Sequence, residues 1–315
     1  MAFEIGTASG HIDLLDKLRL FLTTQLGSQN WQTLRWREMP DAPGEHELVV
    51  KGPGLEGNDE VFVGIRTFSS EGGDYYNWRL RGLLGFNSDF VFSGLPGVTN
   101  AWAPCMLLAN FNIKYWFVAN GRRFVVVAKV STVYESCYMG FIHPYLAPSR
   151  FPYPYFCAGT DVRETERWSI QDELHSHGIL HPTHRTSDVN TGNQSSARLY
   201  EGAWWTIQNR RGTHLSNWSP ITWTEERNMF PQCRYSRYFY ELLRNNVDNS
   251  YTLVPLILFM KSPEGRVWGE LDGCYHVSGF NNPVENIITI NGSDHLVVQN
   301  VNRNGIFDFW ALKLD

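Results

Sequence analysis

A histidine cluster in the middle of the chain is the group of residues whose spacing is most suggestive of chemistry. Its members are His175, His177, His181 and His184. Two imidazoles at His-x-His spacing can bind Zn²⁺ or Fe²⁺ from one side of a strand or loop, and Asp172 or Glu173 could add an oxygen ligand. The cluster contains no cysteine and matches no established metal motif. The alternative interpretation is a polar loop in which histidine is tolerated.

A tryptophan group follows the histidines and could hold a sugar. It consists of Trp204, Trp205, Trp218 and Trp223, with Asn209, Arg210 and Asn217 between them. Indole faces flanked by amides are a common way to stack on a glycan. The alternative is that these side chains serve the protein core or an interface, where aromatic residues are enriched.

Catalytic motifs are missing from the sequence. It contains no GxSxG elbow, HExxH, Walker A or GxGxxG pattern. Acidic residues between positions 161 and 173 offer carboxylate pairs, but polar loops commonly contain such pairs. We therefore name no catalytic residue and expect a protein that is not an enzyme.

Composition narrows the class of protein further. The 315 residues are 43% hydrophobic and 14% aromatic, which favours a large core over disorder. The formal net charge of −5 argues against a general nucleic-acid binder, and no apolar run is long enough to span a membrane. The first residues lack the pattern of a signal peptide, and the five cysteines are dispersed, so we expect reduced thiols and a cytoplasmic site of synthesis.

The elements that must position these residues are mostly strands. Residues 11–26 have the apolar spacing of an amphipathic helix, with Thr7 or Ser9 as its N-cap and Gly27 as its end. Asn-Gly pairs at 120–121, 291–292 and 304–305 predict hairpins, whose type I′ turns need positive φ at both residues. Apolar residues alternate to both faces of the strand after Gly121, which indicates burial on both sides.

A proline-aromatic segment follows that hairpin at residues 143–156. Prolines at this density exclude a helix or a central strand, so we expect an extended arm that docks on an adjacent copy or on another protein. The predicted interface residues are Tyr145, Phe151, Tyr153, Tyr155 and Phe156.

The expected fold is α+β and β-dominated, with antiparallel sheets in a β-sandwich-like arrangement, one N-terminal amphipathic helix and the long arm. Residues 1–142 would form a scaffold of helix and hairpin, 143–196 the arm and a polar insertion, and 197–315 a second β-rich domain. The first and third segments either stand apart or pack as one unit.

Two long segments carry a resemblance to a known family. GIRTFSSEGGDYYNWRLRG at 64–82 and KYWFVANGRRFVVVAKVSTVYESCYMGFIHPYLAPSRFPYPYF at 114–156 resemble a family of tailed-bacteriophage virion proteins. Residues 5–23 and 296–315 are similar to the same family, whereas 159–250 are not. None of these motifs is catalytic, so the resemblance assigns no active site.

The resemblance implies a structural component of the tail, baseplate or neck (collar), located in the virion and assembled in the host cytoplasm. Such a protein forms a symmetric homo-oligomer and contacts other virion proteins, such as those of the tail tube or sheath, without a cofactor or sequence-specific nucleic-acid contact. Two alternatives stay open. One is a receptor- or glycan-binding adhesin of the tail, and the other is a cell-wall-degrading enzyme.

Overall fold

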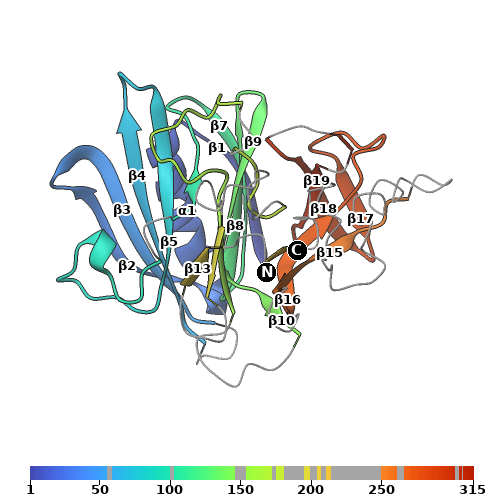
Figure 1. Ribbon diagram of the computed structural model, residues 1–315, viewed down its shortest axis with the longest axis horizontal. Coiled ribbons are helices and arrows are strands. Elements are labelled where there is room, and N and C mark those ends of the chain that lie inside the picture. Colours follow the sequence, from blue (N-terminus) through green and yellow to red (C-terminus); the bar gives the residue numbers. More distant parts are fainter. Residues whose placement is uncertain are drawn as a thin grey trace, which may run out of the picture.

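The computed structural model describes residues 1–54, 59–99, 103–145, 154–171, 175–180, 195–198, 204–206, 211–213, 250–260, 266–301, 305–306 and 308–315. Three antiparallel sheets, here called A, B and C, and one α-helix form the fold of these residues (Figure 1). The predicted β-dominated α+β class with antiparallel sheets and one N-terminal helix is confirmed.

Sheet A is the central layer and has the strand order β1-β7-β8-β9-β11-β12-β13. Its strands are β1 (Ala2–Ala8), β7 (Ile113–Ala119), β8 (Arg123–Val130), β9 (Val133–Phe141), β11 (Tyr155–Ala158), β12 (Ser195–Arg198) and β13 (Trp204–Thr206). The first strand of the chain therefore pairs with β7, more than a hundred residues away, and forms one edge of the sheet.

Sheets B and C lie on opposite sides of sheet A (Figure 1). Sheet B has the order β2 (Gln32–Met39), β3 (Ala42–Gly52), β4 (Val61–Ser70), β5 (Tyr75–Leu83) and β6 (Cys105–Met106). Sheet C has the order β14 (Arg211–Thr213), β15 (Val254–Met260), β16 (Arg266–His276), β19 (Phe309–Lys313), β18 (Ser293–Gln299) and β17 (Ile287–Ile290), with β10 (His143–Pro144) also paired to β16.

The helix α1 (His11–Thr24) lies between sheets A and B (Figure 1). Its N-cap is Gly10, but Ser9 donates its backbone N–H and its hydroxyl to Asp13 at 2.7 and 3.2 Å, which secures the first turn. The helix ends two residues earlier than predicted, and a short 3-10 turn, η1 (Gly27–Gln29), follows it. A second such turn, η2 (Phe92–Gly94), covers part of sheet B.

Two hydrophobic cores share the central sheet. Phe124, Val126 and Ala128 on β8 face the core that α1 and sheet B complete. Val125 and Val127 face the core that sheet C completes. The predicted burial of this strand on both faces is confirmed, because sheet A is sandwiched between two layers.

The hairpins at two Asn-Gly pairs form, but with different turns. At Asn291-Gly292 both residues have positive φ, 53° and 81°, as a type I′ turn requires. Neither Asn120 nor Gly121 is in that region, so the predicted turn type is wrong for the central hairpin. There the Asn120 side chain closes the turn by accepting the backbone N–H groups of Arg122 and Arg123 at 2.9 and 3.1 Å.

The third pair lies partly outside the described residues, at Asn304. The strands that flank it, β18 and β19, do pair in an antiparallel ladder.

The segment predicted to be an arm instead contributes to two sheets. Its start, at β10, pairs with β16, and its end, at β11, pairs with β9 in the central sheet. Tyr155 and Phe156 are therefore 1% and 0% exposed, and the prediction that they belong to a docking arm does not hold. Only Tyr145 of the predicted interface is exposed, at 46%, and Phe151 and Tyr153 lie outside the described residues.

The division into three segments also differs from the observed sheets. Sheet A takes strands from all three predicted segments, and sheet C takes β10 from the middle one. In the described part of the chain, no helix combines the length and the apolar character that a membrane crossing requires.

Candidate functional site

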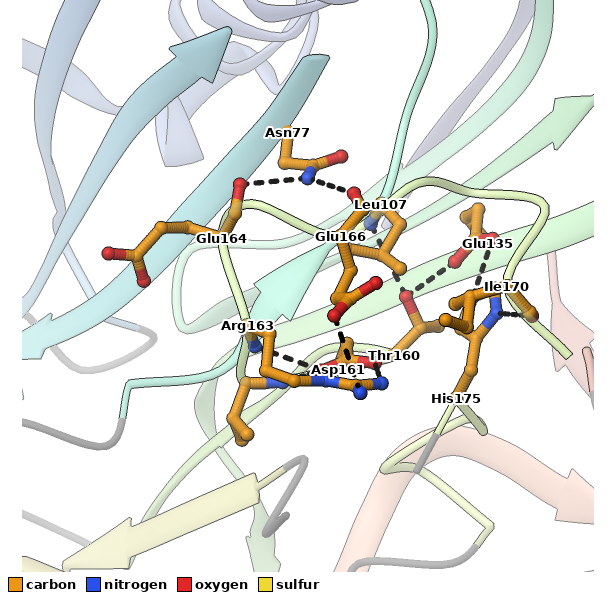
Figure 2. Close-up of polar contacts among 11 residues, drawn as sticks. Asn77, Leu107, Glu135, Thr160, Asp161, Arg163, Glu164, Glu166, Ile170 and His175 are labelled. Atoms are coloured by element: carbon orange, nitrogen blue, oxygen red, sulfur yellow. Dashed lines mark hydrogen bonds and ion pairs between the residues drawn. The ribbon is translucent and has the colours of Figure 1, made fainter. Parts of the chain in front are cut away.

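A buried carboxylate on β9 is the centre of the polar network that Figure 2 shows. Glu135 has 0% exposure and bonds two side chains from the segments that follow β11. One carboxylate oxygen accepts from the hydroxyl of Thr160, and the other accepts from Nε2 of His175 at 2.9 Å. All three side chains are fully buried, so the network is closed to solvent.

The ring of His175 is a double donor. Its Nδ1 donates to the carbonyl oxygen of Ile170 at 2.9 Å, while Nε2 donates to Glu135. Burial by itself lowers the pKa of His175, but the charge of Glu135 and these hydrogen bonds outweigh it and raise the pKa to about 9. The residue is therefore an imidazolium in a buried ion pair at neutral pH.

The loop after β11 is fixed by its own polar contacts. Oδ1 of Asp161 accepts from the backbone N–H groups of Val162 and Arg163, and the guanidinium of Arg163 forks onto the same carboxylate at 3.0 and 2.7 Å. Asn77 on β5 donates to the carbonyl oxygens of Glu164 and Glu166 at 2.9 and 2.7 Å (Figure 2). These bonds attach the loop to sheet B.

His177 is held in one neutral tautomer. Nε1 of Trp310 donates to its Nδ1 at 2.9 Å, so its Nε2 carries the proton and donates to the carbonyl oxygen of Tyr134 at 2.5 Å. The backbone N–H of His177 donates to Asn300. His177 thus joins β9 to β19.

The histidine pair is therefore brought into one region, but each ring nitrogen points to a partner within the chain. An imidazole binds a metal through an unprotonated nitrogen, but both nitrogens of His175 donate hydrogen bonds and Nδ1 of His177 accepts one from Trp310. No group of three or more His, Cys, Asp or Glu side chains is suitably placed for a metal within the described ranges. His181 and His184, together with Asp172 and Glu173, lie outside these ranges, so the zinc or iron site stays a prediction.

The tryptophan group is only partly described. Trp204 is half-buried, donates from Nε1 to the carbonyl oxygen of Gly97 at 2.6 Å, and packs edge-on against Tyr155 with ring centroids 5.1 Å apart. This ring packs within the chain, as the core interpretation predicts. Trp205 contributes its backbone to β13, and Trp218 and Trp223 lie outside the described residues.

Two further charged clusters join sheet A to sheet C, and the sequence analysis missed both. In the first, Nε of the fully buried Arg123 donates to Oδ2 of Asp272 at 3.0 Å, and the amide of Asn120 donates to the same oxygen at 2.8 Å. The charge of Asp272 outweighs burial and raises the pKa of Arg123. The signal was present, since a charged residue begins the very apolar strand β8.

The second cluster centres on Glu285. Lys114 and Lys129 face each other across β7 and β8, and each donates to this carboxylate at 2.6 Å. Tyr134 donates to it at 2.5 Å. Burial raises the pKa of Glu285, but its three partners have the larger combined effect and lower the pKa to about 2. The carboxylate thus neutralises two like charges that would otherwise repel each other.

A surface hollow of about 450 Å³ lies at the start of α1, between Asp13, Asp16, Trp36 and His46. Its acids are already engaged, since Asp13 bonds Lys17 and Asp16 bonds Arg19. The hollow therefore shows no converging set of groups suited to catalysis.

A comparison of the chain with models of known protein families gives no match, and a comparison with curated proteins gives none.

Proposed function

We propose that this protein is a structural component of a tailed-bacteriophage virion, in the tail, baseplate or neck, which acts by oligomeric assembly with other virion proteins. The resemblance at residues 64–82 and 114–156 suggested this function from the sequence alone. Under this proposal the protein is not an enzyme, needs no cofactor and resides in the virion.

The observation that carries the proposal is a contrast between the polar contacts that join the layers of the fold and the apolar side chains that lie on its surface. Polar groups of the described chain tie its layers together: the buried Glu135 bonds His175, the buried Arg123 bonds Asp272, and the partly exposed Glu285 bonds two lysines. Large apolar side chains, in contrast, remain on the surface. They are Met1, Phe3, Ile5, Leu20, Phe90, Val91, Phe111, Tyr145 and Ile287, each more than 40% exposed. Two pairs of them are neighbours, Phe3 with Ile5 on one face of β1 and Phe90 with Val91 in sequence, and adjoining exposed apolar side chains are typical of surfaces that meet other proteins.

The test uses the phage that encodes the chain. An amber codon at Trp31, in the buried core, stops synthesis in a normal host and permits it in a suppressor host. We expect complete particles only in the suppressor host, and peptides of this protein in purified particles by mass spectrometry. Normal infectious particles in the non-suppressing host, or particles that lack the protein, would reject the proposal.

A further inference from the structure

Strand β1 (Ala2–Ala8) forms an unusually open edge of sheet A. Its seven residues pair with β7 without any irregularity, from Ala2 opposite Ala119 to Ala8 opposite Ile113. No described strand pairs with its other side. Half of its backbone N–H and C=O groups therefore point away from the sheet, as they do on any edge strand.

The other edges of the described sheets are protected in ordinary ways. Edge strand β2 carries Arg35 and Arg37 and has two register irregularities against β3. Strand β17 has four residues, β13 and β14 three each, and β6 two. Charges, bulges and short length all discourage edge-to-edge pairing. Strand β1 is seven residues long and has no bulge, and the side chains on the face of Phe3 and Ile5 carry no charge.

The side chains of β1 favour a protein partner. Phe3 and Ile5 are each 49% exposed and stand on the face that carries Val118 and Trp116 of β7. The only charged residue of the strand, Glu4, points to the opposite face, where it accepts a hydrogen bond from the hydroxyl of Tyr115 at 2.7 Å.

We propose that β1 pairs antiparallel with β1 of a second copy of this chain, about a two-fold axis at Ile5. Two copies of sheet A would then form one continuous sheet. In this register Ile5 meets Ile5 of the second copy, Phe3 meets Thr7, and Glu4 meets Gly6. The apolar side chains gather at the axis and no like charges meet.

The neighbouring registers fit less well. An axis at Glu4 places two carboxylates opposite each other, which is destabilising. An axis at Gly6 places Phe3 opposite residue 9, outside the strand. It also brings together two rings of Tyr115, since this ring lies directly over Gly6, 2.4 Å from the position of a Cβ there. The chemistry of β1 thus selects Ile5 as the centre.

Disulfide trapping tests the register directly. The variants are made in a Cys233→Ser background, because Cys105, Cys137, Cys157 and Cys274 are buried. Paired residues of an antiparallel ladder have Cα atoms about 4.5–5.5 Å apart, within the range that a disulfide spans. We expect Ile5→Cys to form a covalent dimer under mild oxidation, and a mixture of Phe3→Cys and Thr7→Cys to link to each other more than to themselves.

The matched control is Ile287→Cys, on the edge strand β17, where the side chain is 43% exposed. Linkage of Ile5→Cys no faster than that of Ile287→Cys would overturn the proposal.

Sedimentation of the unlinked protein gives an independent readout. Ile5→Lys places two ammonium groups at the axis, so we expect the dissociation constant of the dimer to rise about tenfold or more. Ile287→Lys should leave it unchanged. Circular dichroism confirms that both variants are folded. A wild-type chain that stays monomeric at micromolar concentration, or a dimer that Ile5→Lys does not weaken, would overturn the pairing.

The biological role of this dimer rests on the proposed function, but its test does not. A protein found in the virion that fails to pair through β1 would retain the proposed function and lose this inference. A β1 dimer absent from particles would have the opposite consequence.

Discussion

Nε2 of His175 lies 2.9 Å from Oε1 of Glu135, and neither side chain has any exposure to solvent. The pair joins the central strand β9 to a segment 40 residues further along the chain. An ion pair removed from water is costly unless its remaining polar atoms are bonded, and here Thr160 and the carbonyl oxygen of Ile170 meet that need. The pair therefore couples the loop after β11 to the core.

The contribution of this pair to the stability of the fold should be lost at alkaline pH. The pKa of His175 is raised from 6.5 to about 9 in the folded protein. Its contribution to the free energy of unfolding is therefore fully present below pH 6.5 and is lost as pH rises through 9. We expect the urea midpoint of the wild type to fall from about pH 7 to about pH 10 by more than that of His175→Gln.

His177→Gln is the matched control, because the ring of His177 bonds Trp310 and the carbonyl oxygen of Tyr134, which are both uncharged. It should lower stability but keep the alkaline dependence of the wild type. Equal pH dependence in wild type and His175→Gln would contradict the prediction.

The Glu285 cluster should lose its contribution to stability at acidic pH. The pKa of Glu285 is lowered from 4.5 to about 2, so its stabilisation is present above pH 4.5 and is lost as pH falls through 2. Glu285→Gln leaves Lys114 and Lys129 opposed without a counter-charge, and we expect a loss of about 1–2 kcal/mol at neutral pH. Chemical denaturation measures it.

Glu60→Gln provides the comparison for Glu285→Gln. Glu60 pairs with Lys51 at the surface and its side chain is 44% exposed, so this change should cost little. Equal losses in the two variants would show that Glu285 does not hold the layers together.

The hairpins at Asn120-Gly121 and Asn291-Gly292 allow a test of whether a turn is determined by its own residues or by contacts with distant parts of the chain. A Cβ on Gly121 would lie 2.2 Å from the carbonyl oxygen of Gly54, so Gly121→Ala should cost roughly 1–3 kcal/mol through backbone displacement. Gly292 has φ of 81°, and no atom of the described residues lies within 4 Å of a Cβ added there, so Gly292→Ala should cost only the strain of that φ, about 1 kcal/mol. Thermal unfolding of both variants gives the order, and a larger loss at Gly292 would contradict it.

This contrast shows where sequence reasoning succeeds. The hairpin at Asn120 could be predicted because its signal is local, but its turn type could not. The turn adapts to bonds from elsewhere in the chain, with Nε1 of Trp31 donating to the carbonyl oxygen of Asn120 and Gly54 donating to that of Gly121. The helix at residues 11–24 and the two-sided burial of β8 were predictable for the same local reason.

The candidate site was less predictable because its partners are distant in sequence. The histidine pair was visible as a pattern, whereas its acid, Glu135, lies inside an apolar strand and gives no motif. Strand β11 was missed because the surrounding prolines favoured an extended arm. Pairing with β9 and β12 decides its position, and that pairing is not encoded in the segment itself.

Substitution of Tyr155 gives the sharpest test of whether β11 belongs to the core or to an extended arm. Its side chain is 1% exposed, its hydroxyl donates to the carbonyl oxygen of Phe62 at 2.7 Å, and its ring packs edge-on against Phe141 and Trp204. Tyr155→Ala should therefore destabilise the fold by about 3–5 kcal/mol. Tyr145→Ala, at a side chain 46% exposed, should cost less than about 1 kcal/mol.

Deleting residues 149–158 extends the same test, since the deletion removes strand β11. If the segment were a docking arm, the shortened chain would stay folded and only fail to assemble. Because β11 fills the space between β9 and β12, we expect instead a chain that loses cooperative unfolding in calorimetry. A shortened protein with wild-type melting would restore the arm interpretation for Tyr155 and Phe156.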